Sequence, residues 1–514
     1  MKKRFLAIVL TVVMALALAV PSFAALPTAV TTPHSLIVDE RDDYTTNDNL
    51  TNNYIIHQNL TNAPKLIKVQ HQNALYGYVN TSAQTVVQMK YTDIGNFTTE
   101  GLAWAMKNGV AMYVNTQGVE VISVGVATPH DFSNGLARIV EHNGNTYFID
   151  TTGRIVFNLG VEEAGEFDAN GLTWVKSSVT GKYGIINKAG QEVFHFAYDK
   201  LSIDANNKLY YNSGLLRAER DGRVYFLNTI GQEVFCVDAA NYYHLSYVGD
   251  FSNGMCLVKD YAGQVGYIDT TGYMAVYCQY EEGWDFSSVG IARVKRAGYY
   301  GYINKINAYA VQPEYVELYA PVNGLALARR YVRVGDKIVL RYGYVNVFTG
   351  VEQIACTFDH ARPFSEGLAY VDVLGQDGYI KGFINELGTV VFYASWYDEL
   401  GDFHGGLAYA VKNGKYGYIN KLGTTAITAR YDVSYLDAAR TVRDYEHAPY
   451  NFEGNLCIGR IANFDGTSRY SIISSNGYDV YAPTFSDVLY FNPLVDNIAL
   501  FQNAGYNNSI VTLF

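Results

Sequence analysis

Apolar and polar positions alternate along the chain in a unit that recurs about every forty residues. In the clearest copy, the apolar run 407–411 leads into Asn413-Gly414, and a second run, 416–420, follows. Asn-Gly tolerates the positive φ angles that both central residues of a type I′ turn require, so the two runs are predicted to pair as a hairpin. A second turn at 420–423 leads to a third apolar stretch. Each unit is therefore predicted to hold three short antiparallel strands.

A short triplet marks the repeats: an aromatic or aliphatic pair followed by Asn or Asp, with 35 to 42 residues between successive copies. The ten clear triplets end at Asn80, Asn115, Asp150, Asn187, Asn228, Asp269, Asn304, Asn346, Asn385 and Asn420. A degenerate eleventh copy passes through residues 472–474. One such unit cannot bury its apolar face alone, but stacked neighbours can. We expect an all-β array of about eleven three-stranded units, either an open curved solenoid or a propeller-like arrangement.

Each unit also opens with a second signature, Phe followed by two variable residues, Gly, Leu and Ala, as at residues 364–369. The residues two and four positions after this Gly are mostly small and apolar. Strand side chains alternate, so these two share a face and let a neighbouring sheet approach closely. The residue three positions after the Gly varies and is predicted to be exposed. The aromatic residues at this variable position are the predicted binding residues, because a flat ring can stack on a sugar or anchor a protein: Trp104, Trp174, Tyr370 and Tyr409.

The opening signature, the Gly-Lys-Tyr-Gly-Tyr-Ile-Asn core at 414–420 and the turn after it resemble the WG-repeat family, close to the KWG repeats. The resemblance covers about residues 70–480. Tyr stands in place of Trp in the eponymous Trp-Gly dipeptide, as at Tyr416-Gly417. The family implies a repeat scaffold that has no shared catalytic site and whose partners are mostly undefined.

Residues 144–153 and 222–231 are similar to the choline-binding and glucan-binding cell-wall repeats, which hold their ligand between paired aromatic rings. The period here is nearly twice as long, and the chain has only four Trp. This second resemblance implies, as an alternative, a cell-wall polysaccharide-binding protein.

The composition of the chain divides it into four segments, of which the repeats are one. Residues 1–24 have a basic start, an apolar run and small residues before the end, as a secretory signal cleaved after Ala24 does. Residues 25–70 are predicted to be a flexible leader or cap, 71–440 the repeats, and 441–514 a degenerate repeat with a C-terminal cap. No later run approaches about 18 apolar residues, so no integral membrane segment is expected in the mature chain. We expect a secreted protein, held at the cell wall without a covalent anchor if it is held there at all.

The net charge of the chain limits the classes of partner that it is expected to bind. Loss of Lys2, Lys3 and Arg4 with the signal lowers the formal net charge from -11 to -14. Such a chain is a poor partner for nucleic acid and for anionic membranes, which attract basic surfaces. The five cysteines are odd in number and lack metal-like spacing, so they are predicted to be structural thiols, with Cys256 small and buried.

Motifs for catalysis, metal binding or cofactor binding are absent from the sequence, so no catalytic residue, metal or cofactor is expected. Five carboxylates precede the opening Phe of their units: Asp131, Glu166, Asp250, Asp285 and Asp402. A row of carboxylates could bind calcium or position a sugar, and a carbohydrate-active enzyme built on them is a further alternative. Their recurrence favours a structural role as acceptors for backbone amides in a turn. The expected function is a secreted, non-enzymatic scaffold that binds a protein or a glycan at the bacterial cell envelope.

Overall fold

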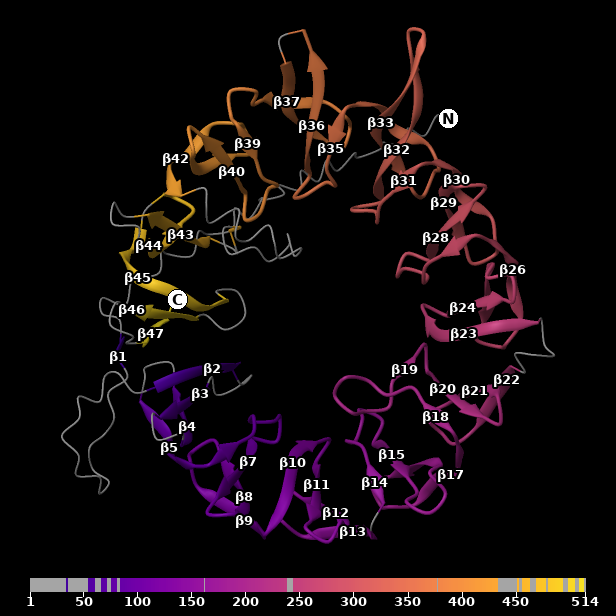
Figure 1. Ribbon diagram of the computed structural model, residues 1–514, viewed down its shortest axis with the longest axis vertical. Coiled ribbons are helices and arrows are strands. Elements are labelled where there is room, and N and C mark those ends of the chain that lie inside the picture. The colour runs from indigo at the N-terminus through magenta and orange to yellow at the C-terminus, as the bar shows by residue number, and fades with distance from the viewer. Residues whose placement is uncertain are drawn as a thin grey trace, which may run out of the picture.

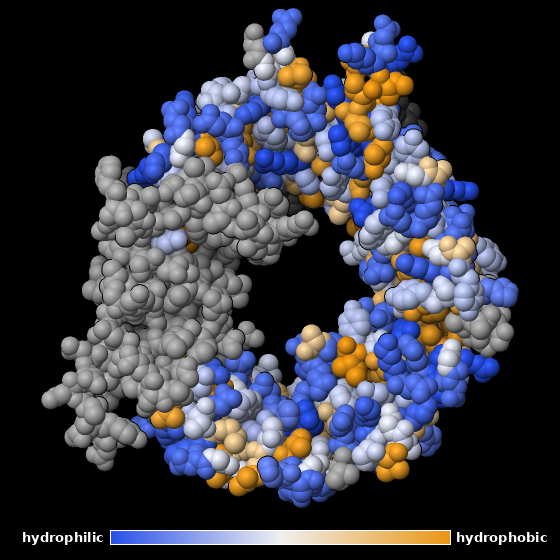
Figure 2. Space-filling view, viewed as in Figure 1, coloured by the Kyte–Doolittle hydropathy of each residue, from blue (hydrophilic) through white to orange (hydrophobic). Residues whose placement is uncertain are grey.

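The computed structural model describes residues 34–35, 54–60, 66–71, 75–80, 84–160, 162–237, 244–376, 378–432, 451–452, 455–462, 468–477, 479–492, 498–503 and 508–512. These residues form strands and turns without a helix. Small antiparallel sheets follow one another around a ring (Figure 1). Side chains leave the centre of the ring open, as Figure 2 shows. The predicted all-β repeat array is confirmed, and its arrangement is propeller-like.

Sheets one to ten lie in chain order, and each places its first strand toward the central opening (Figure 1). The ten first strands are β2 (Tyr54–Leu60), β6 (Asp93–Ile94), β10 (Ala127–Ser133), β14 (Glu163–Ala164), β18 (Lys200–Leu201), β23 (Leu245–Ser252), β27 (Glu282–Gly283), β31 (Glu317–Leu318), β35 (His360–Ala361) and β39 (Glu399–Leu400). Most of them have two residues. This strand was not predicted, so each sheet has four strands where the sequence indicated three.

The three predicted strands of each unit are the longer strands that follow. The second strands are β3 (Leu66–His71), β7 (Leu102–Lys107), β11 (Leu136–Glu141), β15 (Leu172–Lys176), β20 (Leu215–Arg220), β24 (Met255–Asp260), β28 (Ile291–Arg296), β32 (Leu325–Val334), β36 (Leu368–Gly375), β40 (Leu407–Lys412) and, in the eleventh unit, β43 (Leu456–Ala462). The third strands are β4 (Tyr76–Asn80), β8 (Val110–Asn115), β12 (Thr146–Asp150), β16 (Tyr183–Asn187), β21 (Arg223–Leu227), β25 (Val265–Asp269), β29 (Tyr299–Asn304), β33 (Lys337–Asn346), β37 (Gly378–Asn385), β41 (Lys415–Asn420) and β44 (Ser468–Ser474).

The fourth strands form the outer edge of the ring. They are β5 (Thr85–Tyr91), β9 (Glu120–Gly125), β13 (Ile155–Gly160), β17 (Glu192–Tyr198), β22 (Glu233–Val237), β26 (Met274–Tyr280), β30 (Tyr309–Tyr315), β34 (Glu352–Phe358), β38 (Val390–Tyr393), β42 (Thr425–Asp432) and β45 (Asp479–Asn492). The fifth sheet has one further short strand, β19 (Tyr211–Asn212), which pairs with β20.

The turns follow the predicted chemistry. Asn413 and Gly414 have φ angles of 53° and 72°, as a type I′ turn requires. After the third strand, Oδ1 of Asn420 accepts hydrogen bonds from the amides of Leu422 and Thr424 at 3.0 and 3.1 Å. A side-chain oxygen that accepts two nearby amides fixes the turn, which explains why the triplet ends in Asn or Asp.

The glycine of the Tyr-Gly dipeptide makes room for a bulge in the outer strand. A Cβ atom at Gly417 would lie 2.3 Å from the carbonyl oxygen of Ile427. The register between β41 and β42 shifts at this point, where Tyr416 faces Tyr431 and Tyr418 faces Ile427. No larger residue fits under the bulged strand, so the Gly of this dipeptide is a steric requirement.

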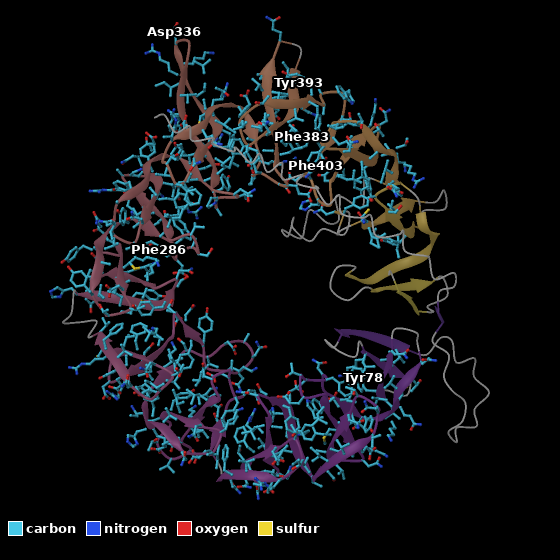
Figure 3. The ribbon with its side chains drawn as sticks, turned by 180° about the vertical axis from the view of Figure 1, so that it is seen from behind. Tyr78, Phe286, Asp336, Phe383, Tyr393 and Phe403 are labelled. Atoms are coloured by element: carbon cyan, nitrogen blue, oxygen red, sulfur yellow. The ribbon has the colours of Figure 1, made fainter. Side chains whose placement is uncertain are left out.

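The core consists of layers between successive sheets. One layer joins Tyr370 and Phe383 of the ninth sheet to Phe403, Ala408 and Ala410 of the tenth. The rings of Phe383 and Phe403 meet edge to face at 5.0 Å (Figure 3). The small residues predicted to permit close approach are buried in this layer. Because each sheet is covered on both faces by its neighbours, the stacking of units supplies the burial that a single unit lacks.

The last sheet joins the two ends of the chain. Residues 479–485 of β45 pair with β44, and residues 485–492 pair with β46 (Ile498–Asn503), which pairs with β47 (Asn508–Thr512). The outermost position is taken by β1 (His34–Ser35), where His34 faces Ile510. This last sheet thus has six strands, and a strand from near the N-terminus forms one of its edges. Within the predicted leader or cap, β1, β2 and β3 are strands of the ring.

The five cysteines carry free thiols, and Cys256 is fully buried, as predicted. Across the described part of the chain, no helix is long and apolar enough to cross a membrane.

Candidate binding site on the inner rim

A cavity of about 850 Å³ lies where the second, third and fourth sheets meet. Its wall combines Trp104 from β7, Asp131 from β10, Arg138 from β11 and Glu166, which follows β14. Residues 205–208, from the long connection between β18 and β19, close one side. Four successive sheets therefore contribute to one site near the inner edge of the ring.

The indole of Trp104 is held by its own sheet. Gly95 lies beneath the ring, where a Cβ atom would be 2.1 Å from the indole nitrogen. The indole donates a hydrogen bond to the carboxylate of Asp131 in the next sheet. Trp104 is half-buried and forms part of the cavity wall. One aromatic face is thus fixed in orientation beside a set of polar groups.

Arg138 connects the charged groups of the site. Its guanidinium donates to Oε1 of Glu166 at 3.2 Å and lies 3.1 Å from Nδ1 of His130. Burial and the nearby positive charge of Arg138 lower the pKa of His130 to about 4. His130 is therefore neutral at pH 7, and its Nδ1 accepts a hydrogen bond from the guanidinium of Arg138.

The two carboxylates are incompletely satisfied. Burial raises the pKa of Glu166, while the charge of Arg138 opposes that rise. Burial also raises the pKa of Asp131, against the hydrogen bond from Trp104. Among the described residues, Oδ1 of Asp131 and Oε2 of Glu166 are buried and have no hydrogen-bond partner. Buried polar atoms of this kind carry a free-energy cost that a hydrogen-bond donor would relieve.

The connection between β18 and β19 is fixed against the fourth sheet. The carbonyl of Asn207 accepts hydrogen bonds from the amide of Glu166 at 3.0 Å and from the indole of Trp174 at 3.2 Å. Trp174 thus supports the wall from behind. It is 8 % exposed and does not line the cavity.

The structure does not bring the four predicted binding residues together. Trp104, Trp174, Tyr370 and Tyr409 lie in the second, fourth, ninth and tenth sheets. The hydroxyl of Tyr370 donates to Asp372 at 3.1 Å, and that of Tyr409 donates to Glu399 at 2.8 Å. Of the four, Trp104 alone lines the cavity.

The prediction that the variable position is exposed is wrong. Trp174 and Tyr370 are each 8 % exposed, and the others are half-buried. Both faces of each sheet are covered by neighbouring sheets. Successive side chains of a strand therefore point alternately into the interface with one neighbouring sheet and into the interface with the other. At Arg293, for example, the guanidinium lies 3.8 Å from the ring of Trp284 and donates to the carbonyl of Leu318 in the next sheet at 2.7 Å.

The structural interpretation of the five carboxylates also needs correction. Three of them accept hydrogen bonds from side chains of the preceding sheet, where turn amides were predicted. Asp250 accepts from the hydroxyl of Ser202 at 2.7 Å, and Asp402 accepts from Arg362 at 3.4 Å. Glu166 follows the same pattern through Arg138. Their recurrence therefore reflects contacts between sheets.

His130, Arg138 and Lys208 were not predicted as site residues. One signal in the sequence could have indicated Arg138, because a basic residue at the variable position of one unit precedes an acidic residue before the opening Phe of the next. His130 and Lys208 follow no repeated pattern.

In the described ranges no three His, Cys, Asp or Glu side chains are grouped as a metal site would need.

Two solved structures match the chain weakly. BamB from Moraxella catarrhalis is 11 % identical with a TM-score of 0.25, covering 56 % of this chain and 98 % of that one. A eukaryotic initiation factor is 9 % identical with a TM-score of 0.29, covering 67 % and 96 %. No curated protein matches the chain.

The sequence model of the WG containing repeat matches seven segments, which are residues 76–110, 148–178, 266–300, 300–330, 342–375, 382–416 and 416–435. Each matched segment begins within a third strand, and these strands are β4, β12, β25, β29, β33, β37 and β41. The chain therefore contains WG repeats in these seven segments.

Proposed function

We propose that this protein is a secreted, non-enzymatic scaffold that binds a glycan of the bacterial cell envelope in the cavity on the inner rim. The observation that carries the proposal is the composition of the 850 Å³ cavity: an oriented indole beside buried carboxylate oxygens that lack donors. Ligand sites typically combine an aromatic wall with a few convergent polar groups.

A glycan supplies what these groups lack. Sugar hydroxyls donate hydrogen bonds, which the free oxygens of Asp131 and Glu166 can accept. The apolar face of a sugar ring can lie on the indole of Trp104. The cavity walls belong to sheets and to a connection fixed by Asn207, so the site exists before the ligand arrives.

Binding of defined cell-wall fragments, measured by titration calorimetry, tests the proposal. Trp104→Ala removes the stacking face and is expected to weaken binding at least about tenfold. Trp396→Ala is the matched control, because Trp396 is exposed and lies outside the cavity. Equal affinity of the Trp104→Ala variant and the parent protein would contradict the site assignment.

Two further readouts separate the rival functions. Turnover of a glycan that is lost in the Glu166→Gln variant would show an enzyme and contradict the non-enzymatic part. Retention of envelope proteins with no glycan bound would contradict the glycan part. The secretory part predicts that the exported protein begins at Ala25, which N-terminal sequencing measures.

A further inference from the structure

Two hairpins are longer than the others. β32 and β33 have ten residues each, and β36 and β37 have eight each, whereas second and third strands elsewhere have five to seven. They belong to adjacent sheets, the eighth and ninth, and extend beyond the outline of the ring (Figure 1). Asp336, in the turn of the first hairpin, lies at its far tip (Figure 3). The outer ends of both hairpins therefore project from the ring.

Large apolar side chains near both tips face water. Ile338 is 72 % exposed and Leu374 is 60 % exposed. Val334, Tyr379 and Ile380 are also exposed. Figure 2 shows hydrophobic residues along the first hairpin beneath a hydrophilic tip. Apolar residues gathered on a projecting element indicate a contact surface, whereas isolated ones do not.

These side chains cover both faces of each ribbon. In the second hairpin, Leu374 pairs with Tyr379 and Val373 pairs with Ile380, and successive pairs point to opposite faces. In the first, Ile338 pairs with Arg333, while Val334 and Lys337 form the next pair on the other face. A protein that docks on one face would leave the other in water. An occupant that surrounds the tip covers both.

The first tip carries Arg333, Asp336 and Lys337, all exposed, and their net charge of +1 is compatible with anionic headgroups. Arg333 and Lys337 are exposed, and Arg333 donates to the carbonyl of Gly335 at 3.1 Å. Within the described residues, neither forms an ion pair with an acidic side chain. The net negative charge of the chain would repel such a surface elsewhere on the ring.

We propose that the tips of the β32–β33 and β36–β37 hairpins bind the interfacial region of an anionic phospholipid bilayer. The exposed apolar side chains enter the interface, the hydroxyls of Tyr331 and Tyr379 remain at headgroup level, and the two cations approach the phosphates. In the described part of the chain, no strand pairs with the outer edges of the first hairpin beyond Arg329 and Tyr342, and such edges limit the insertion to the hydrated interface.

Flotation of the mature protein with vesicles tests this proposal. Vesicles of phosphatidylcholine with phosphatidylglycerol should carry the protein, and phosphatidylcholine alone should carry less. The double variant Ile338→Asp, Leu374→Asp should lower the partition coefficient at least about tenfold. The control, Leu387→Asp with Leu422→Asp, changes two equally exposed apolar residues in turns of the ring and should leave partition unchanged.

A second pair of variants isolates the charge. Arg333→Glu with Lys337→Glu should reduce partition into the anionic vesicles, whereas Arg154→Glu with Lys200→Glu, exposed elsewhere, should not. Failure of the parent protein to float, or hairpin variants that float as it does, would overturn the proposal. A parent that sediments as a dimer, becomes monomeric in the hairpin variant and does not float would show an interface between copies.

Discussion

The hydroxyl of Tyr344 donates a hydrogen bond to the backbone carbonyl of Arg362 at 2.7 Å, and this bond joins the eighth sheet to the ninth. The same relationship recurs at other boundaries, where Tyr78, Tyr113, Tyr267 and Tyr302 reach a carbonyl 17 residues later. The Tyr at the start of the triplet is therefore a bond between neighbouring units as well as a core residue.

Tyr344→Phe should remove that bond and leave the carbonyl of Arg362 without its partner. The expected loss is about 1–2 kcal/mol in the free energy of unfolding, measured by urea titration. Other units have Phe at this position, so the ring itself fits. A variant as stable as the parent would show that the hydroxyl contributes nothing to cohesion between sheets.

Gly417→Ala should be more damaging than the same change at Gly414. At Gly417 the new methyl group would meet the carbonyl oxygen of Ile427 at 2.3 Å, and relief of that clash should cost about 3 kcal/mol. At Gly414 there is open space, and only the positive φ of 72° opposes Ala, at about 1 kcal/mol. Thermal melts of the two variants compare them directly, and equal losses would contradict the bulge explanation.

Asp131→Asn should stabilise the fold at neutral pH. Because burial raises the folded-state pKa of this carboxyl, its charge destabilises the protein above that pKa, and the penalty disappears below the unfolded value of about 4. The gain in melting temperature should therefore be present at pH 7 and shrink on acidification. Asp150→Asn is the control, because its hydrogen bonds with Thr152 lower the pKa of Asp150. A gain at Asp150, or none at Asp131, would be inconsistent with this account.

Deletion of residues 25–36 should loosen the closure of the ring. Without β1, the edge of β47 that faces His34 and Ser35 loses its pairing partner. Hydrogen–deuterium exchange should become faster in β47 and remain unchanged in β29, which belongs to the distant seventh sheet. Unchanged exchange in β47 would mean that the N-terminal strand does not hold the last sheet.

The sequence predicted those parts of the fold that depend on local chemistry. Asn413-Gly414 and Asn420 specify their turns directly, and the alternation around Ala408 and Ala410 identified a buried face. The first strand of each sheet escaped prediction because two residues, such as Asp93 and Ile94, are too few to show a period. The pairing of β1 with β47 joins segments more than 470 residues apart, and no local pattern encodes it.

The candidate site was only partly predictable for a related reason. Trp104, Asp131 and Glu166 were each notable within their own unit, but their assembly depends on how successive sheets turn around the ring. The exposure of the variable position was predicted because the residue there differs from unit to unit. In a ring of stacked sheets, neither face is free, so Trp174 and Tyr370 are buried.

Because the first and last strands of the polypeptide share one sheet, the point at which the chain begins is arbitrary with respect to the fold. Residue 512 could be linked to residue 34, and new ends could be opened between two other sheets. Every sheet would then keep the same neighbouring sheets in the same order. The protein should therefore tolerate circular permutation, and a second domain could be fused at each boundary between sheets.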